Sequence, residues 1–264
     1  MNDTKVDQIA DRIYRISTCI PEIAPGGFTF NQFLVDAEEP LLYHTGMRQL
    51  FPLVREAVEK VLPVERLRWV AFAHVEADEC GAVDDFLAAA PHAQVVHGAL
   101  GVMVSLNDML DRPPRALADG EVLDIGGAGL RRNVLEVATP HVPHNWESHV
   151  FFEQETRTLF CGDLCTQLGD GAAVTDHDLL DGAIAAEEMF CSTSMGPAIP
   201  AAYRRLADLD PTTLAVMHGS SYNGDCARLL RDLADVYESR FGCQPAAVAA
   251  KALPGRGASV GASR

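Results

Sequence analysis

A short acidic segment gathers side chains that could bind a metal ion. His74, Glu76 and Asp78 stand on alternate residues, and Glu79 follows directly. In an extended backbone alternate side chains point to one side, and a turn at Asp78 can aim Glu79 inward as well. Such crowding of negative charge, without a Lys or Arg between residues 70 and 90, is costly unless a cation neutralises it. The segment therefore predicts a metal site.

Three further candidate ligands stand where a loop leaves a predicted strand. His144 follows a Pro-rich loop, Asp163 follows residues 158–161, and His218 closes residues 214–217. Taken singly each signal is weak, because a lone His is more often a core or surface residue and a lone Asp is usually a turn former. Loops at the ends of strands can converge on one end of a sheet assembly, so together with the acidic segment these residues strengthen the prediction.

Neighbouring residues leave alternatives open. His141 competes with His144 for the role of loop ligand, and its sequence context makes His144 the better candidate. His149 begins an apolar strand. It is either a buried, hydrogen-bonded histidine or a residue that contacts a metal ligand without binding the metal itself. Cys80 is adjacent to the acidic segment, and we interpret it as a buried thiol rather than as a soft ligand.

Apolar patterns divide the chain into strands and helices. Aromatic and β-branched residues predict strands over residues 12–18, 28–35, 40–43, 69–73, 94–97, 121–125, 130–138, 149–153, 158–161 and 214–217. Helical spacing or composition predicts helices over residues 50–62, 81–90, 183–191, 201–209 and 225–241. We expect one domain over residues 1–250 and a disordered tail over residues 251–264, which are rich in Gly, Ala and Ser.

Composition narrows the classes of function. With 21 Lys and Arg against 37 Asp and Glu, the net charge of −16 gives little support to nucleic-acid binding. No stretch reaches the roughly 18 apolar residues of a membrane-spanning helix, and the charged start is unlike a secretory signal. The seven cysteines lack paired spacing, and Cys161 and Cys165 are interpreted as buried thiols rather than as a redox pair. We therefore expect a cytoplasmic protein.

The order of these residues resembles the metallo-β-lactamase superfamily, and within it the flavodiiron, or oxygen-binding di-iron, branch. The motif His-x-Glu-x-Asp-His-x-Gly matches the acidic segment up to Gly81, except that Glu79 stands where a second His is expected. A His before Ser148 matches His144, the Asp of Cys-Gly-Asp matches Asp163, and a final His-Gly pair matches His218 and Gly219. The resemblance covers about residues 8–240 and implies an α/β fold, an αββα sandwich of two mixed β-sheets flanked by helices.

The resemblance also implies which residues hold metal. His74, Glu76 and His144 would hold one ion, Asp78 and His218 the other, and Asp163 would bridge them. Glu79 would either fill the place of the missing histidine or turn outward and leave a mononuclear site. The implied cofactor is a pair of iron ions, because carboxylate oxygens suit iron, with zinc or manganese as the other possible metals.

Two functions follow from the resemblance. In the first, a di-iron protein binds and reduces dioxygen, peroxide or nitric oxide, or senses them, as a homodimer. We expect no fused flavodoxin domain, so a separate donor of flavodoxin or rubredoxin type would supply electrons. In the alternative, a metal-dependent hydrolase cleaves an ester, thioester or phosphoester with a metal-bridging hydroxide, which Asp78 or Asp163 would orient as catalytic residues.

Overall fold

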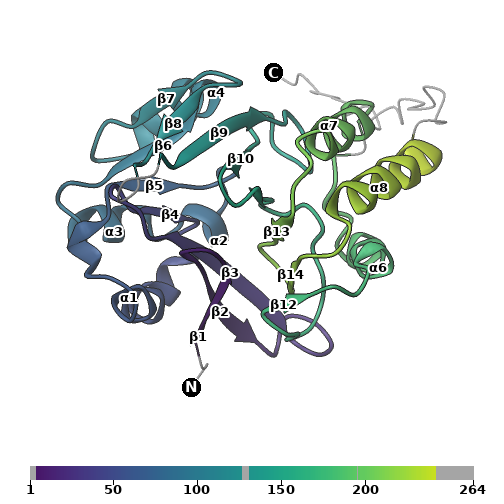
Figure 1. Ribbon diagram of the computed structural model, residues 1–264, viewed down its shortest axis with the longest axis horizontal. Coiled ribbons are helices and arrows are strands. Elements are labelled where there is room, and N and C mark those ends of the chain that lie inside the picture. The colour runs from purple at the N-terminus through teal and green to yellow at the C-terminus, as the bar shows by residue number, and fades with distance from the viewer. Residues whose placement is uncertain (1–3, 127–130, 195, 242–264) are drawn as a thin grey trace, which may run out of the picture.

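Two β-sheets lie face to face between two layers of helices, as Figure 1 shows. The structure is a computed structural model that describes residues 4–126, 131–194 and 196–241. Each sheet has seven strands. The predicted fold class, an αββα sandwich with two mixed sheets, is therefore confirmed. Among the described residues, no helix has the length and apolar character needed to cross a membrane.

The first sheet follows the chain in order. Its antiparallel part is formed by β1 (Thr4–Ala10), β2 (Ile13–Ile20), β3 (Phe28–Val35) and β4 (Leu41–Tyr43). Parallel strands continue it: β5 (Trp69–Ala71), β6 (Gln94–Gly98) and β7 (Arg115–Leu117). Parallel strands need crossover connections, and these connections carry helices on the outer face of the sheet.

The second sheet has a more mixed order. Antiparallel pairing joins β8 (Val122–Asp124), β9 (Asn133–Ala138), β10 (His149–Glu153) and β11 (Thr158–Phe160). Beyond β11 lie β13 (Thr213–Ala215), β14 (Ser221–Tyr222) and β12 (Val174–Thr175). Because β11 and β13 run parallel, the loops that follow them leave the same edge of this sheet.

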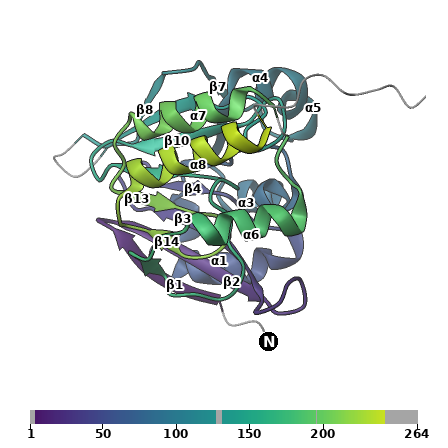
Figure 2. The same ribbon diagram turned by 90° about the vertical axis from the view of Figure 1, so that its right-hand side faces the viewer.

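Helices cover both outer faces. The first sheet carries α1 (Phe51–Glu59), α2 (Ala77–Cys80), α3 (Val83–Ala89) and the short turns η1 (Arg48–Leu50) and η2 (Val64–Arg66). Near its β6–β7 edge lie α4 (Ala99–Gly101), the π-helical η3 (Val102–Leu106) and α5 (Asn107–Met109). Figure 2 looks onto α6 (Leu180–Phe190), α7 (Ala198–Ala207) and α8 (Cys226–Phe241), which cover the second sheet.

The alternation of side chains along β3 shows why a strand of this composition lies inside the sandwich. All eight residues are buried. Phe28, Phe30 and Leu34 pack under the helices of the first sheet, whereas Phe33 and Val35 face the second sheet. The aromatic rings between the sheets have centroids 5.0–5.9 Å apart, and burying each such ring contributes about 1.5–3 kcal/mol.

The structure corrects several predicted boundaries. The strand predicted over residues 69–73 ends at Ala71, and the helix predicted over residues 81–90 is shorter, since α3 spans Val83–Ala89 and a separate helical turn, α2, precedes it. The acidic segment is therefore not one extended strand: a bend at residues 73–75 precedes the helical turn α2. Strand β1 and the helical residues 99–109 were not predicted. Residues 127–130 and the tail 251–264 lie outside the described residues, so the predictions made for them stay predictions.

Candidate metal centre

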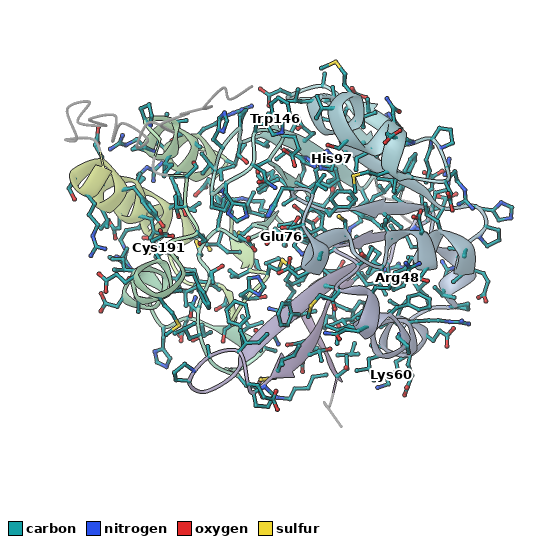
Figure 3. All side chains as sticks on the ribbon, turned by 180° about the vertical axis from the view of Figure 1, so that it is seen from behind. Arg48, Lys60, Glu76, His97, Trp146 and Cys191 are labelled. Atoms are coloured by element: carbon teal, nitrogen blue, oxygen red, sulfur yellow. The ribbon has the colours of Figure 1, made fainter. Side chains whose placement is uncertain are left out.

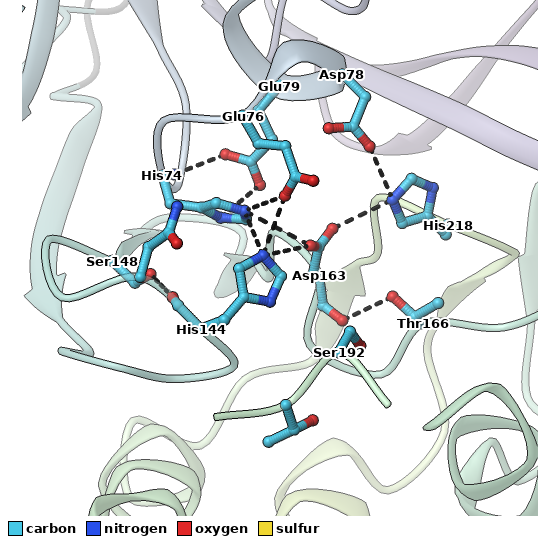
Figure 4. A network of polar contacts seen from close by, with 12 residues as sticks. His74, Glu76, Asp78, Glu79, His144, Ser148, Asp163, Thr166, Ser192 and His218 are labelled. Carbon is cyan, nitrogen blue, oxygen red and sulfur yellow. Dashed lines mark hydrogen bonds and ion pairs between the residues drawn. The ribbon is translucent and has the colours of Figure 1, made fainter. Parts of the chain in front are cut away.

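Loops from both sheets meet at one place, where Figure 4 shows the predicted ligands facing one another. His74 and Glu76 follow β5, and Asp78 lies in α2. The remaining side chains come from the second sheet: His144 from the β9–β10 loop, Asp163 from the loop after β11, and His218 from the loop after β13. In Figure 3, Glu76 lies near the middle of the molecule.

Four of these residues surround one position. The Nε2 atoms of His74 and His144 are 2.8 Å apart, and Glu76 Oε2 lies 2.9 Å from the first and 3.0 Å from the second. Asp163 Oδ2 completes the group at 3.7 Å from His74 Nε2 and 3.5 Å from His144 Nε2. Ligand atoms of all four residues lie within 4.8 Å of one another.

These separations fit a metal ion. A tetrahedral ion with bonds of about 2.1 Å holds its ligand atoms about 3.4 Å apart, and the five separations given above range from 2.8 to 3.7 Å. Two imidazole nitrogens at 2.8 Å repel one another if both present lone pairs, unless a proton or a metal ion lies between them. The first position therefore has the geometry and the chemistry of a metal site.

A second position lies on the other side of Asp163. His218 Nε2 is 3.2 Å from Asp163 Oδ1 and 3.4 Å from Asp78 Oδ2. The two oxygens of the Asp163 carboxylate therefore face different sets of residues, which is the arrangement of a bridging ligand.

Strand β3 holds His218 in place. The ring nitrogen Nδ1 of His218 lies 2.7 Å from the carbonyl oxygen of Thr29, and the ring stacks on Phe28 with centroids 4.3 Å apart. A proton on Nδ1 would be donated to that carbonyl, which leaves the lone pair of Nε2 for a metal ion. Asn31 ties the same loop to β3, because its Nδ2 donates to the carbonyl oxygens of Val216 and Gly219.

Without a cation, protons balance the charge of the site. Burial opposes the charging of His218, but its contacts with Asp163 and Asp78 raise its pKa to about 10. Burial raises the pKa of Asp163, yet the surrounding histidines bring it below its usual range. Contact with His144, and then with His74, lowers the pKa of Glu76 to about 2. Metal binding must therefore release protons from the imidazoles.

The Glu79 carboxylate is directed at His74 and lies outside the four-residue group of the first position. Its Oε2 accepts a hydrogen bond of 2.6 Å from the backbone N–H of His74, and its Oε1 lies 3.2 Å from His74 Nδ1. The Nε2 of a second buried histidine, His44, is 3.5 Å from the same Oε1. The sequence motif placed Glu79 beside the ligands but gave no signal for the direction of its carboxylate.

The structure also shows where the other candidate residues of the sequence lie. His141 is exposed, and His144 is the histidine of this loop that faces the cluster. Cys80 is buried, with burial raising the pKa of its thiol to about 12, and its Sγ contacts the carbonyl of Glu76. Cys161 and Cys165 are buried free thiols.

His149 belongs to a second buried group that sequence reasoning missed. Its ring packs against His97 with centroids 4.1 Å apart, and its Nδ1 lies 3.6 Å from Glu136 Oε1. His97 ends a predicted strand and Glu136 lies inside another, so neither carried a motif that pointed to a site. The backbone N–H of His149 donates to the carbonyl of Ala73, which fixes this group behind the metal centre.

Comparison with known proteins places the chain in a family. The family described as ODP family beta lactamase matches residues 28–219, more than half of the chain. The putative diflavin flavoprotein A 1 of Thermosynechococcus vestitus is 28% identical over 203 residues, which cover 73% of this chain and 34% of that protein. The chain thus spans about a third of the length of the curated relatives that it matches.

Solved structures agree on the fold. A variant of the flavo di-iron protein from Thermotoga maritima superposes with a TM-score of 0.77 and 18% identity, covering 90% of this chain and 62% of that one. Rubredoxin oxygen:oxidoreductase from Desulfovibrio gigas gives a TM-score of 0.73 and 17% identity, covering 88% of this chain and 62% of that one. The chain belongs to the ODP family of β-lactamase-like proteins, in the flavodiiron branch of the metallo-β-lactamase superfamily.

Proposed function

We propose that this chain holds two iron ions and forms the di-iron centre of an oxidoreductase that reduces dioxygen, peroxide or nitric oxide. The observation that carries the proposal is the Asp163 carboxylate, whose two oxygens face two separate sets of ligands. His74, Glu76 and His144 would hold one ion with Asp163, and Asp78 and His218 would hold the other.

The chemistry of the ligands favours iron. Three imidazoles and three carboxylates face the two positions, and this mixture of nitrogen and hard oxygen ligands suits iron. Three negative charges leave a small positive balance against two divalent ions, which an anionic ligand such as hydroxide can neutralise. Zinc and manganese remain the other candidate metals.

The protein positions the metal ions and leaves room for a small molecule to reach them. The iron ions would supply the electrons that pass to a small diatomic molecule or peroxide. Glu76 is about half exposed on its side of the centre, which leaves the first position open to solvent. Beside Asp163 a cavity of roughly 20 Å³, lined also by Thr166 and Thr193, has room for a molecule the size of water. Both features fit a small substrate.

Electrons must reach the centre from another redox group. The relatives named above are flavoproteins, a flavo di-iron protein and a rubredoxin-dependent oxidoreductase, which supports a donor of flavin or rubredoxin type. We propose such a donor, in this polypeptide or in a partner, together with a homodimeric assembly in the cytoplasm.

Consumption of dioxygen and nitric oxide by anaerobically iron-loaded protein, with a reduced flavin or rubredoxin as donor, tests the proposal. We expect turnover that requires iron and that is lost in His218→Ala but kept in His177→Ala, because His177 is an exposed histidine outside the centre. A protein that binds zinc or manganese, hydrolyses esters and consumes neither gas would support the hydrolase instead.

A further inference from the structure

We propose that Glu79 is the positioning residue of His74 and not a metal ligand, so that the two cation positions are unequal and fill in sequence. The inference rests on the two-cation site proposed above. It assigns four protein ligands to the first position and three to the second. The carboxylate that replaces the expected histidine would thus strengthen the first position and leave the second one incomplete.

The Glu79 carboxylate contacts His74 through both oxygens. Oε2 accepts the backbone N–H of His74 at 2.6 Å, and Oε1 lies 3.2 Å from Nδ1 of the same residue. The opposite ring atom, Nε2, faces Glu76 and His144. The negative charge of Glu79 at 3.2 Å favours a proton on Nδ1, and that tautomer presents Nε2 to the metal, as carboxylates behind metal-bound histidines do.

The surroundings of Glu79 hold it in this direction. Its side chain is fully buried, and its carbonyl oxygen accepts the backbone N–H of Thr45 at 2.7 Å. A Cβ atom on Gly162 would lie 3.3 Å from Oε1 and 2.6 Å from Ala73 Cβ, so the chain passes closely on that side. On another side of the Glu79 carboxylate, His44 Nε2 lies 3.5 Å from Oε1. Turning toward the second position would break the 2.6 Å hydrogen bond in a dry interior.

The consequence is a difference in the number of ligands. The first position has His74, Glu76, His144 and Asp163, whereas the second has Asp78, His218 and the other oxygen of Asp163. Three protein ligands with an open place are typical of sites that complete their coordination with water or substrate. The second ion would therefore bind more weakly than the first, because fewer protein side chains hold it.

Titration of the metal-free protein with Co²⁺, followed by its visible absorption and by equilibrium dialysis, tests the inference. Wild type should bind two ions in two resolved steps, with the first at least about tenfold tighter. Glu79→Gln should weaken the first step about 10–100-fold, the usual effect of losing a carboxylate behind a metal-bound histidine, and leave the second nearly unchanged. The reverse pattern, or two equal steps in wild type, would overturn it.

A matched control is available in Glu147. It is also a buried glutamate that accepts a backbone N–H of this segment, from Val75 at 3.1 Å, but no contact joins it to the His74 ring. Glu147→Gln should leave both Co²⁺ steps in place. If Glu79→Gln does not fold, long-range ¹H–¹⁵N spectra of Zn²⁺-loaded wild type decide: His74 should carry its proton on Nδ1, and a metal-bound Nδ1 would refute the inference.

These measurements do not depend on turnover. If the protein binds Co²⁺ in two unequal steps but reduces neither dioxygen nor nitric oxide, the proposed function fails and the assignment of Glu79 stands. If it reduces these gases but Glu79→Gln weakens only the second step, the function stands and the assignment of Glu79 fails.

Discussion

At the scale of single residues, Asp163 is the side chain on which both cation positions depend. Its Oδ2 belongs to the group of His74, Glu76 and His144, and its Oδ1 lies 3.2 Å from His218 Nε2. No other residue is shared in this way among the part of the chain that the structure describes. Removal of its carboxylate should therefore affect two sites at once.

The variant Asp163→Ala should lose both metal ions together, because each position loses one of its few ligands. Asp78→Asn should keep the first ion and lose the second, since Asp78 lies beside His218 and outside the first group. Metal analysis after exhaustive dialysis gives the stoichiometry of each variant. Retention of a full metal complement by Asp163→Ala would show that the bridging assignment is wrong.

At the scale of elements, the centre depends on how closely two loops approach. Gly162 precedes the bridging carboxylate with a φ of +52°, and a Cβ there would lie 2.6 Å from Ala73 Cβ in the loop that carries His74. Only glycine combines this backbone conformation with this contact. The Cys-Gly-Asp sequence therefore brings the loops after β5 and β11 together.

The variant Gly162→Ala should be destabilised through both the positive φ and the clash. Gly120→Ala is the matched control, because Gly120 has a φ of +81° but no atom within 4 Å of an added Cβ. The control should cost about 1–2 kcal/mol, and Gly162→Ala should cost more than the control by at least about 1 kcal/mol and weaken metal binding. Urea unfolding and Co²⁺ binding of the two variants would measure this, and equal losses would contradict it.

Strand β9 provides a pH dependence that is separate from the metal ligands. Glu136 is 1% exposed, and burial, followed by repulsion from Asp119, raises its pKa to about 8. Because the folded-state pKa exceeds the unfolded value, the proton stabilises the fold. Its contribution is complete below about pH 4.5 and is lost as the pH rises to about 8, at up to about 1.4 kcal/mol per pH unit.

The variant Glu136→Gln should remove this dependence. The free energy of unfolding of wild type minus that of the variant should fall steadily between about pH 5 and pH 8, because other titrating groups cancel in the difference. Glu65→Gln, at an exposed glutamate, serves as the control for the Glu-to-Gln change itself. A constant difference for Glu136→Gln would show that Glu136 is ionised in the folded protein.

At the scale of the whole molecule, the resemblance to the metallo-β-lactamase superfamily predicted the sandwich, and the positions of polar residues after predicted strands predicted most of the convergence. The structure brings His74, Glu76, Asp78, His144, Asp163 and His218 together, because each lies in a segment that follows a strand and that leaves the sheets on the same side. Strand ends are visible in a sequence as apolar runs followed by polar residues, so this part was predictable.

Other features could not be predicted for identifiable physical reasons. The direction of Glu79 depends on the backbone N–H of His74, and hydrogen bonds to backbone leave no pattern in residue types. Strand β1 has no fully buried residue, so it lacks the alternation that marks a half-buried strand. The helical residues 99–109 expose Leu100, Met103 and Met109, which removes the usual apolar stripe.

Anomalous diffraction at the iron edge, from crystals of the protein saturated with Fe²⁺ under anaerobic conditions, tests the central claim most directly. We predict two iron peaks a few ångström apart, one among His74, Glu76 and His144 and the other beside Asp78 and His218, with the Asp163 carboxylate between them. One peak at saturation, or peaks that Asp163 does not join, would contradict the account.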